Sequence, residues 1–422
     1  MSSKLRLGAL AFVLASALPA QDLTGDWQGK LNGSGLRLVV RLRQSAGAWK
    51  ALLYSVDQGN DGVRADSVTF DGSVLKVELD SFNARYEGTI SSDGGSIKGS
   101  WSQGAKLPLD LTRATEATAW LRDAAQHTSQ FVTVDNNVSL EVLDWGGSGR
   151  PVVFLAGLGN TAHVFDEFAP KLTSSYHVYG ITRRGFGFSS SPETGYSADR
   201  LGDDVLAVID FLKLQRPVLI GHSIAGEELS SIGSRHPERV AGLVYLDAGY
   251  GYAFYDAATG DARVDSVDVR KKLEQVVSMT GNQKKLIKDL IETDLPRLQK
   301  DLKAWQKEVE ANDWPSQPAS KAFSPSKAVL LGEQEYTNIK APVLAFYALP
   351  HKPLPAVANN PEKRAAAEAH DMEFTGAQAK AFETGIPGSR VLRLPHADHY
   401  VFKSNPDEVL SEINKFIANL PK

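Results

Sequence analysis

One short segment of the chain carries the pattern of a serine nucleophile. Residues 217–226 read Pro-Val-Leu-Ile-Gly-His-Ser-Ile-Ala-Gly, an apolar run followed by small residues around Ser223. A serine hydroxyl becomes a good nucleophile only when a base takes its proton. A tight strand-to-helix turn exposes such a serine beside backbone N–H groups, and its flanking residues are small because other backbone comes close. The segment predicts that Ser223 is a nucleophile on such a turn, and the alternative is a structural turn serine.

The pattern departs in one place from the usual Gly-x-Ser-x-Gly, because Ala225 stands where the second glycine is expected. Alanine is the smallest residue with a side chain, and Gly226 follows it directly. We interpret the change as a tolerated variant. Gly-x-Ser alone is common by chance, so the apolar strand before it and the helical pattern after it carry the prediction.

A nucleophilic serine needs a histidine to take its proton and a carboxylate to hold the imidazole. Two histidines, His396 and His399, follow the last apolar run of the chain. Among the carboxylates, Asp247 comes directly after an apolar run, while Asp371 and Glu373 lie farther along. Asp247 could instead only cap the next turn. The residue types alone leave these alternatives open.

Composition sets the outer limits of the interpretation. The chain has 422 residues, 42% of them apolar and 23% charged, which is typical of a globular protein. At about 150 residues per domain, this length predicts two or three domains. The net charge of −4 and the lack of long runs of one sign predict no nucleic-acid partner. The absence of cysteine excludes disulfides, thiolate metal sites and cysteine nucleophiles.

The first residues have the features of an export signal. Lys4 and Arg6 precede the apolar stretch 7–18, and Ala20 offers a small residue at a cleavage point. We expect residues 1–20 to be a secretory signal cleaved after Ala20, with the mature protein periplasmic or secreted. The alternative is an ordinary apolar first helix. No later stretch approaches the roughly 20 apolar residues of a membrane helix, so we expect no stable membrane insertion.

Residues 21–113 form a region of short apolar runs separated by turn signals such as Asp71-Gly72 and 93–95. Several short strands at close spacing predict a small all-β domain, an antiparallel sandwich or barrel. No catalytic constellation is visible in it. The expected strands are 36–42, 63–70, 74–79, 84–90 and 96–101.

After a linker at 114–130, the pattern changes to α/β from residue 131 to 422. Near-continuous apolar runs alternate with helical patterns, which predicts a mostly parallel sheet with helices on both faces. The expected strands are 138–145, 151–155, 178–182, 216–221, 241–246, 342–347 and 390–394, and two of the expected helices are 203–212 and 227–236.

The alternation is interrupted between residues 250 and 340. The segments 269–280 and 282–312 are polar, amphipathic and helical. We expect this insertion to form a helical lid over the carboxyl ends of the strands. Pro296 should kink or divide its longest helix, because proline lacks an N–H and its ring clashes with the preceding turn.

From about residue 131 to its end, the chain resembles the α/β-hydrolase superfamily, in particular its esterases and proline-iminopeptidase-like members. Besides the serine segment, three stretches carry the resemblance. Residues 154–159 resemble the loop that supplies an oxyanion donor, 181–189 resemble an Arg-Gly-x-Gly-x-Ser stretch, and 397–402 resemble the histidine segment before a final helix. The set is more specific than any one member.

The resemblance assigns roles to particular residues. The family order of nucleophile, acid and histidine favours His399 over His396. In many members the acid follows the strand after the lid, but residues 345–352 contain no carboxylate. Some members carry it on the preceding strand, so we favour Asp247, with Asp371 or Glu373 as alternatives. The backbone N–H groups of Leu158 and Ile224 are the expected oxyanion donors.

Other residues near these segments are assigned to the surroundings of the site. We group Gly157, His222, Tyr250, Tyr252 and Phe254 with the substrate pocket, although the aromatic residues could equally pack in the core. His222 is expected to point away from the serine as a packing residue. Arg183 and Arg184 should pair with nearby carboxylates, a structural role.

The β-rich region also resembles a known arrangement. Residues 25–29 read Gly-Asp-Trp-Gln-Gly, similar to the start of a β-rich module that precedes the hydrolase domain in some exported bacterial hydrolases. We expect a packing module or spacer; the alternative is a role in binding substrate, cell wall or a second subunit. Trp27 and Trp101 are expected in its core.

The resulting prediction is a serine hydrolase that cleaves a carboxylic ester through Ser223, His399 and Asp247. Alternatives are an iminopeptidase-like aminopeptidase using acidic lid residues such as Glu292 and Asp294 to hold an amine, a lactonase, and a non-catalytic small-molecule binder. We expect a small-molecule ester or amide substrate, no cofactor and no metal. The remaining histidines lack metal-ligand spacing and are assigned to structure or surface: His163, His177, His351 and His370.

Overall fold

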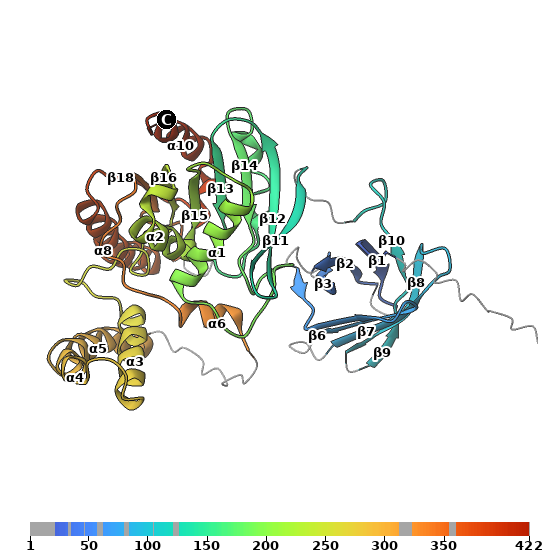
Figure 1. Cartoon of the computed structure of the whole chain (residues 1–422), viewed down its shortest axis with the longest axis horizontal. Helices are drawn as coiled ribbons and strands as arrows, with labels where there is room; N and C mark the ends of the chain where they lie inside the picture. Colours follow the sequence, from blue (N-terminus) through green and yellow to red (C-terminus); the bar gives the residue numbers. More distant parts are fainter. Residues whose placement is uncertain are drawn as a thin grey trace, which may run out of the picture. The chain divides into compact units, whose positions relative to one another are not determined.

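The structure is a computed structural model that describes residues 22–421, except 33–34, 46, 57–61, 80–83, 104, 121–125, 312–322 and 354–359. The chain divides into two compact units, residues 1–121 and 122–422 (Figure 1). The boundary falls within the segment 114–130 that the sequence marks as a junction. The expected export signal, residues 1–20, lies outside the described residues.

The first unit is one antiparallel sheet with the strand order β4-β3-β2-β1-β10-β8-β7-β6-β5, and β9 pairs with β8. The two ends of this path, β4 and β5, are separated in sequence by residues 65–66 alone, and β3 also contacts β5. The sheet therefore curves back on itself like a small barrel. Its strands are β1 (Gly25–Lys30), β2 (Arg37–Ser45), β3 (Ala48–Ser55), β4 (Val63–Arg64), β5 (Ser67–Phe70), β6 (Val74–Leu79), β7 (Ala84–Ile90), β8 (Ser96–Gln103), β9 (Ala105–Pro108) and β10 (Leu111–Arg113).

The core of this unit explains the spacing of its apolar residues. Along β7, buried and exposed residues alternate strictly, as in a sheet with one face toward the core. Trp27 is fully buried and donates its indole N–H to the carbonyl of Leu23 at 2.8 Å, and Trp101 is also buried. The expectation that both tryptophans are core residues is confirmed. The strand expected over 63–70 is instead divided into β4 and β5.

The second unit contains an eight-stranded sheet with the order β11-β12-β14-β13-β15-β16-β17-β18. The strand β12 pairs antiparallel with both β11 and β14, and all pairings from β14 to β18 in this order are parallel. The predicted α/β-hydrolase fold is confirmed. The strands are β11 (Thr128–Asp135), β12 (Val138–Gly147), β13 (Pro151–Leu155), β14 (His177–Ile181), β15 (Val218–His222), β16 (Gly242–Leu246), β17 (Val343–Ala348) and β18 (Arg390–Leu394).

Helices cover both faces of this sheet, and each face has its own apolar core. One core contains side chains of α1 (Ala198–Phe211), α2 (Gly226–Arg235) and α8 (Pro361–Gly385). The other contains side chains of the short turn η2 (Ala162–Phe165), α9 (Val401–Ser404) and α10 (Pro406–Ala418) (Figure 1). Every residue of β15, β16 and β17 is buried, which explains why these strands read as unbroken apolar runs.

The insertion between β16 and β17 is helical, as the sequence predicts. It contains α3 (Ala262–Val277), α4 (Gln283–Asp289), a π-helical turn η6 (Leu290–Asp294), α5 (Leu295–Ala311) and α6 (Pro325–Leu330). The long run expected over 282–312 is divided just before Pro296, which is the second residue of α5. The expected effect of the proline is confirmed, and the wider π turn accommodates its missing N–H.

The end of the insertion lies against a loop that leaves the sheet. A Cβ on Gly185, in the loop after β14, would come within 2.5 Å of Pro325, the first residue of α6. A Cβ on Gly332 would come within 1.9 Å of the Tyr196 carbonyl. The α6 segment is therefore fixed to the loops that follow the carboxyl end of β14. No helix in the described part of the chain is long and apolar enough to cross a membrane.

We predict that Gly226→Ala destabilises the second unit. A Cβ at this first residue of α2 would meet the Ala248 carbonyl oxygen at 2.0 Å, so backbone must move. We expect the free energy of unfolding to fall by about 1–3 kcal/mol, measured by urea denaturation. The control is Gly376→Ala in α8, where the nearest atom is Leu349 Cδ2 at 3.9 Å. The control should be neutral or gain about 0.5–1 kcal/mol; equal losses in both variants would contradict the close approach.

Candidate active site

Ser223 lies on a sharp turn between a buried strand and a helix. The strand β15 ends at His222, a single 3-10 turn covers Ser223–Ala225, and α2 begins at Gly226. Ser223 has a φ of 54°, in the left-handed region that a residue with a Cβ rarely adopts. Its neighbours on both sides are buried while Ser223 is partly exposed. The turn therefore holds a strained serine outward, the geometry of a nucleophile elbow.

The structure explains why alanine is accepted after the serine. Ala225 has φ −61° and ψ −11°, which is helical backbone where a Cβ costs nothing. The neighbouring glycines are less replaceable. A Cβ on Gly221 would lie 2.9 Å from Leu229 Cδ1. At this elbow, the neighbouring atoms thus come closest at Gly221 and Gly226. An alanine in place of glycine at position 225 leaves the geometry of the turn intact.

The loop after β13 passes directly over the serine. A Cβ on Gly157 would lie 3.3 Å from the Cβ of Ser223 and 2.8 Å from Nδ1 of His222. Only glycine fits without a shift, so backbone at Gly157 lies against the elbow. This approach brings the next residue of the loop, Leu158, to the same end of the sheet as Ser223 and Ile224. The two expected oxyanion donors therefore come from segments that meet at the serine.

A fully buried carboxylate, Asp247, lies at the end of the adjacent strand β16. Its Oδ1 accepts hydrogen bonds from the backbone N–H of Ala348 at 3.0 Å and the hydroxyl of Tyr250 at 2.9 Å. Its Oδ2 faces Nδ1 of His399 at 2.7 Å and Nε2 of His351 at 2.9 Å. Burial by itself raises the pKa of Asp247, but the two histidines outweigh it and hold the pKa at about 2. The carboxylate is ionised at neutral pH.

The structure separates the candidate residues that the sequence left open. His399, on the loop after β18, contacts Asp247, whereas His396 is exposed and bonds through its backbone N–H to the Pro350 carbonyl. Glu373 is exposed on α8. Asp371 does not face His399; its carboxylate contacts His351 instead.

A second imidazole at Asp247 is the main feature that sequence reasoning missed. His351 Nδ1 lies 3.0 Å from Asp371 Oδ2, and the backbone N–H of His351 donates to the same oxygen at 2.6 Å. Thr375 donates to the other oxygen of Asp371 at 2.6 Å. Burial lowers the pKa of His351, but Asp247 and Asp371 outweigh it and raise the pKa to about 9. We had assigned His351 to structure or surface; it lies between two carboxylates as an imidazolium.

His222 packs against the loop that carries His399. It is 1% exposed, its Nε2 lies 3.1 Å from the His399 carbonyl oxygen, and its ring lies 4.6 Å from the rings of both His399 and Tyr400. Burial, followed by the nearby His399, lowers the pKa of His222 to about 3. The ring is therefore neutral and donates from Nε2, because a carbonyl can only accept. Tyr400 in turn donates to Asn160 Oδ1 at 3.1 Å. His222 has the packing role that we favoured for it.

The aromatic group after Asp247 divides between site and core. Tyr250 holds Asp247, and the Tyr252 hydroxyl lies near the Ser223 side chain. Phe254 instead packs edge-on against Phe382 of α8, with 6.0 Å between ring centroids. Of the aromatic residues expected in the pocket, Tyr252 is the one placed at the serine, whereas Phe254 contributes to the core.

The two arginines after β14 are structural, as expected. Arg183 pairs with Glu228 through contacts of 2.6 and 2.8 Å and also donates to the Ala156 carbonyl. Arg184 pairs with Asp204 through two contacts of 2.6 Å. Arg183 thereby ties the loop over the serine to helix α2.

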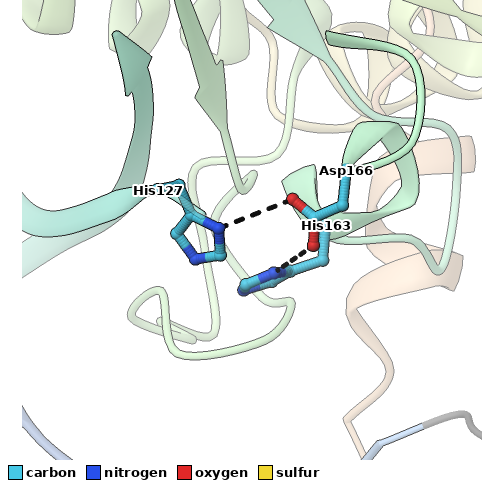
Figure 2. A group of neighbouring side chains, drawn as sticks. All are labelled: His127, His163 and Asp166. Carbon is cyan, nitrogen blue, oxygen red and sulfur yellow. Dashed lines mark hydrogen bonds and ion pairs between the residues drawn. The ribbon is translucent and has the colours of Figure 1, made fainter. Parts of the chain in front are cut away.

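Two groups of side chains in the described part of the chain could hold a metal ion by their geometry. One consists of Asp247, His351 and His399, and its contacts are already accounted for by hydrogen bonds through the shared carboxylate. The other consists of His127, His163 and Asp166 (Figure 2). The spacing argument from sequence detected neither group, because their members come from distant segments.

A model of the alpha/beta hydrolase fold family matches residues 150–406. The chain belongs to this family. It is similar to 2-(acetamidomethylene)succinate hydrolase of Mesorhizobium japonicum, with 23% identity over 271 residues, 64% of this chain and 89% of that protein. It is 37% identical over 120 residues to non-heme chloroperoxidase of Streptomyces lividans, 28% of this chain and 44% of that protein. The latter match thus spans less than half of the relative.

Two solved structures are similar to part of the chain. An esterase from Exiguobacterium antarcticum matches with a TM-score of 0.44 and 18% identity, covering 69% of this chain and all (100%) of that one. Est816, described as an N-acyl homoserine lactone degrading enzyme, matches with a TM-score of 0.43 and 22% identity, covering 68% of this chain and 100% of that one. The chain is a hydrolase-family protein, and the fold implies small-molecule substrates.

We predict that His351 stays protonated well above neutral pH. Its ring proton resonance, identified by its loss in His351→Gln, should titrate near pH 9, and Asp371→Asn should lower that midpoint. Because the folded pKa lies above the unfolded value of about 6.5, the stabilisation is complete below pH 6.5 and is lost as pH rises through about 9. Asp371→Asn should therefore cost more stability at pH 6 than at pH 10 in urea denaturation. A midpoint near 6.5 in the wild type would contradict this ion pairing.

Proposed function

We propose that the protein is a serine hydrolase that cleaves a carboxylic ester by acyl transfer through Ser223, with His399 as the base and Asp247 as the acid that holds it. The observation that carries the proposal is the strained, outward-held Ser223 at the end of β15, one strand away from the buried Asp247–His399 pair. Each of these parts has a direct chemical use in acyl transfer.

In the first half of the reaction, His399 Nε2 takes the Ser223 hydroxyl proton as Oγ attacks the substrate carbonyl carbon. The carbonyl π electrons move to oxygen, where the N–H groups of Leu158 and Ile224 stabilise the negative charge. The oxyanion then collapses, the ester C–O bond breaks, and His399 returns the proton to the leaving alcohol. Asp247 fixes the Nδ1–H tautomer throughout and stabilises the imidazolium.

In the second half, water replaces the alcohol. The water oxygen attacks the acyl carbon while His399 takes a proton from the water, and a second oxyanion forms. When this collapses, the bond to Ser223 Oγ breaks, the proton returns to Oγ, and the carboxylic acid leaves. The buried environment of Asp247, with an exposed fraction of 0%, keeps its charge available to the imidazole in both halves.

A second candidate, an amidase for substrates with a free amine, is favoured by one specific observation. Glu227 is the second residue of α2 and lies four residues after Ser223. Its side chain is fully buried, and neither carboxylate oxygen has a hydrogen-bond partner among the described residues. Burial, then the charges of Glu228 and Glu333, raise its pKa well above the usual value. The ammonium group of a substrate would give Glu227 the positively charged partner that its carboxylate lacks.

The lid carboxylates that we expected for this purpose are placed differently. Glu292 is exposed, and Asp294 is paired with Lys272 at 2.7 Å and lies 3.9 Å from Arg297. Glu333, at the end of the insertion, is buried and held by Arg263. Any amine subsite would therefore use α2 and the end of the insertion rather than the π-helical turn η6.

We predict that Ser223→Ala abolishes hydrolysis of p-nitrophenyl esters, lowering kcat by about 10⁴–10⁶, because no other described residue takes the nucleophile's position. Asp247→Asn should lower kcat by about 10⁴, since the wrong imidazole tautomer is favoured. The measurement is p-nitrophenol release across a chain-length series of esters. The control is Ser234→Ala, which changes a partly buried serine on α2 and should keep wild-type rates. Near wild-type turnover in either site variant would overturn the corresponding role.

We predict that Glu227→Gln separates the two candidate substrates. If the amine candidate holds, the wild type should hydrolyse proline p-nitroanilide at least tenfold better, in kcat/KM, than its N-acetyl form, because only the free amine pairs with Glu227. Glu227→Gln should remove this preference, whereas the exposed Glu292→Gln should keep it. Equal rates on the free and acetylated substrates would leave ester hydrolysis as the function.

A further inference from the structure

A second cluster of side chains, which shares no residue with the group around Asp247, lies within the hydrolase unit. His127 immediately precedes β11, and His163 and Asp166 lie in and just after the short turn η2. Figure 2 shows both imidazoles turned toward the carboxylate of Asp166. The spacing of three residues between His163 and Asp166 places them on one side of the turn, and the fold adds His127 from a segment 36 residues earlier (163 − 127).

Each imidazole of this cluster lies close to one of the two carboxylate oxygens of Asp166. Nδ1 of His163 lies 3.1 Å from Asp166 Oδ2, and Nδ1 of His127 lies 3.6 Å from Asp166 Oδ1. One donor atom from each of the three residues lies within 4.8 Å of the others. Ligands held at about 2.0–2.1 Å in a tetrahedron are separated by about 3.3 Å, so the observed spacing brackets the required edge.

The surroundings orient the donor atoms as outer contacts of a metal site do. The indole N–H of Trp145 donates to Asp166 Oδ1 at 2.9 Å, which fixes the carboxylate. On the far side of His163, its Nε2 lies 4.0 Å from Glu141 Oε1. Metal-bound histidines commonly present their other ring N–H to a carboxylate, which sets the tautomer that leaves the ligand nitrogen free.

The charges of the cluster also call for a cation. Asp166 and Glu141 are both buried, with side chains 5% and 4% exposed. In the part of the chain that the structure describes, the ion pairs of both carboxylates are made to histidines alone. Neutral imidazoles cannot compensate two buried negative charges, whereas a dication can.

We propose that His127, His163 and Asp166 form a binding site for a divalent transition-metal ion of the Zn²⁺ type. Two imidazole nitrogens and one carboxylate oxygen favour Zn²⁺ over Mg²⁺ or Ca²⁺, which prefer oxygen ligands. Three protein ligands leave one tetrahedral position for water. The partly exposed ring of His163, with 23% of its side chain accessible, gives the ion a route from solvent.

The position of the site gives it a consequence for the hydrolase unit. The ion would join the start of the unit, at His127, to η2, which directly follows the loop 156–160 over Ser223. That loop is otherwise held by Arg183 at Ala156 and by Tyr400 at Asn160. Metal binding would add a third attachment, since ligand binding to the folded state alone stabilises it.

The test is zinc binding to the chelator-stripped full chain carrying Ser223→Ala, so that the result does not depend on the proposed catalytic activity. Zn²⁺ is titrated in competition with a chromophoric chelator, and thermal unfolding is followed with and without the ion. We expect one Zn²⁺ per chain and a higher Tm with zinc. His127→Gln, His163→Gln and Asp166→Asn should each weaken binding at least 100-fold.

Matched controls locate the site. His177→Gln removes a histidine that also pairs with an aspartate, Asp144 at 2.9 Å, but has no second imidazole beside it, and it should bind zinc as the parent does. His351→Gln removes a ligand from the other possible cluster and should also leave the stoichiometry at one. Circular dichroism establishes whether each variant is folded. If one of the three ligand variants does not fold, the folded ones still test the site. No zinc binding in the parent, or loss of zinc in His351→Gln but not in the folded ligand variants, would overturn the proposal.

Discussion

The buried carboxylate of Asp247 is the interaction on which the arrangement of the active site depends. An ionised group at 0% exposure is tolerated only when its oxygens are satisfied, and Asp247 faces four partners. These come from β17, from the start of the insertion, and from the loops after β17 and β18. Satisfying one buried charge therefore brings together segments that are separated by up to 152 residues in the sequence.

The parallel sheet makes this convergence possible. Parallel strands present their carboxyl ends at one edge, so residues that follow β13, β15, β16, β17 and β18 meet there. Both Ser223 and Asp247 adopt positive φ angles, 54° and 47°, at the ends of adjacent strands. Such backbone costs about 1–3 kcal/mol at each residue and persists only where the surrounding packing over-determines it. The buried strands β15 and β16 provide that packing.

Sequence patterns predicted the parts of this site that are local, and missed those that depend on packing. The apolar run ending at Ser223 specifies both a buried strand and its turn, so the elbow could be read directly. The pairing of His351 with Asp371 could not be predicted, because Asp371 lies on α8, whose many alanines and charged residues give no clear apolar face. The strands β1 and β3 were missed for a similar reason, since their charged and apolar residues do not alternate regularly.

The sharing of one carboxylate oxygen by two imidazoles fixes the orientation of Asp247. Its Oδ2 lies 2.7 Å from Nδ1 of His399. Here Oδ2 of Asp247 also faces His351, whose pKa is raised to about 9, so the carboxylate already has a positive partner at neutral pH. That partner fixes Oδ2 between the two rings, in the orientation that also faces Nδ1 of His399. Asp371 maintains this arrangement from α8, because it holds His351 protonated and positioned against Asp247.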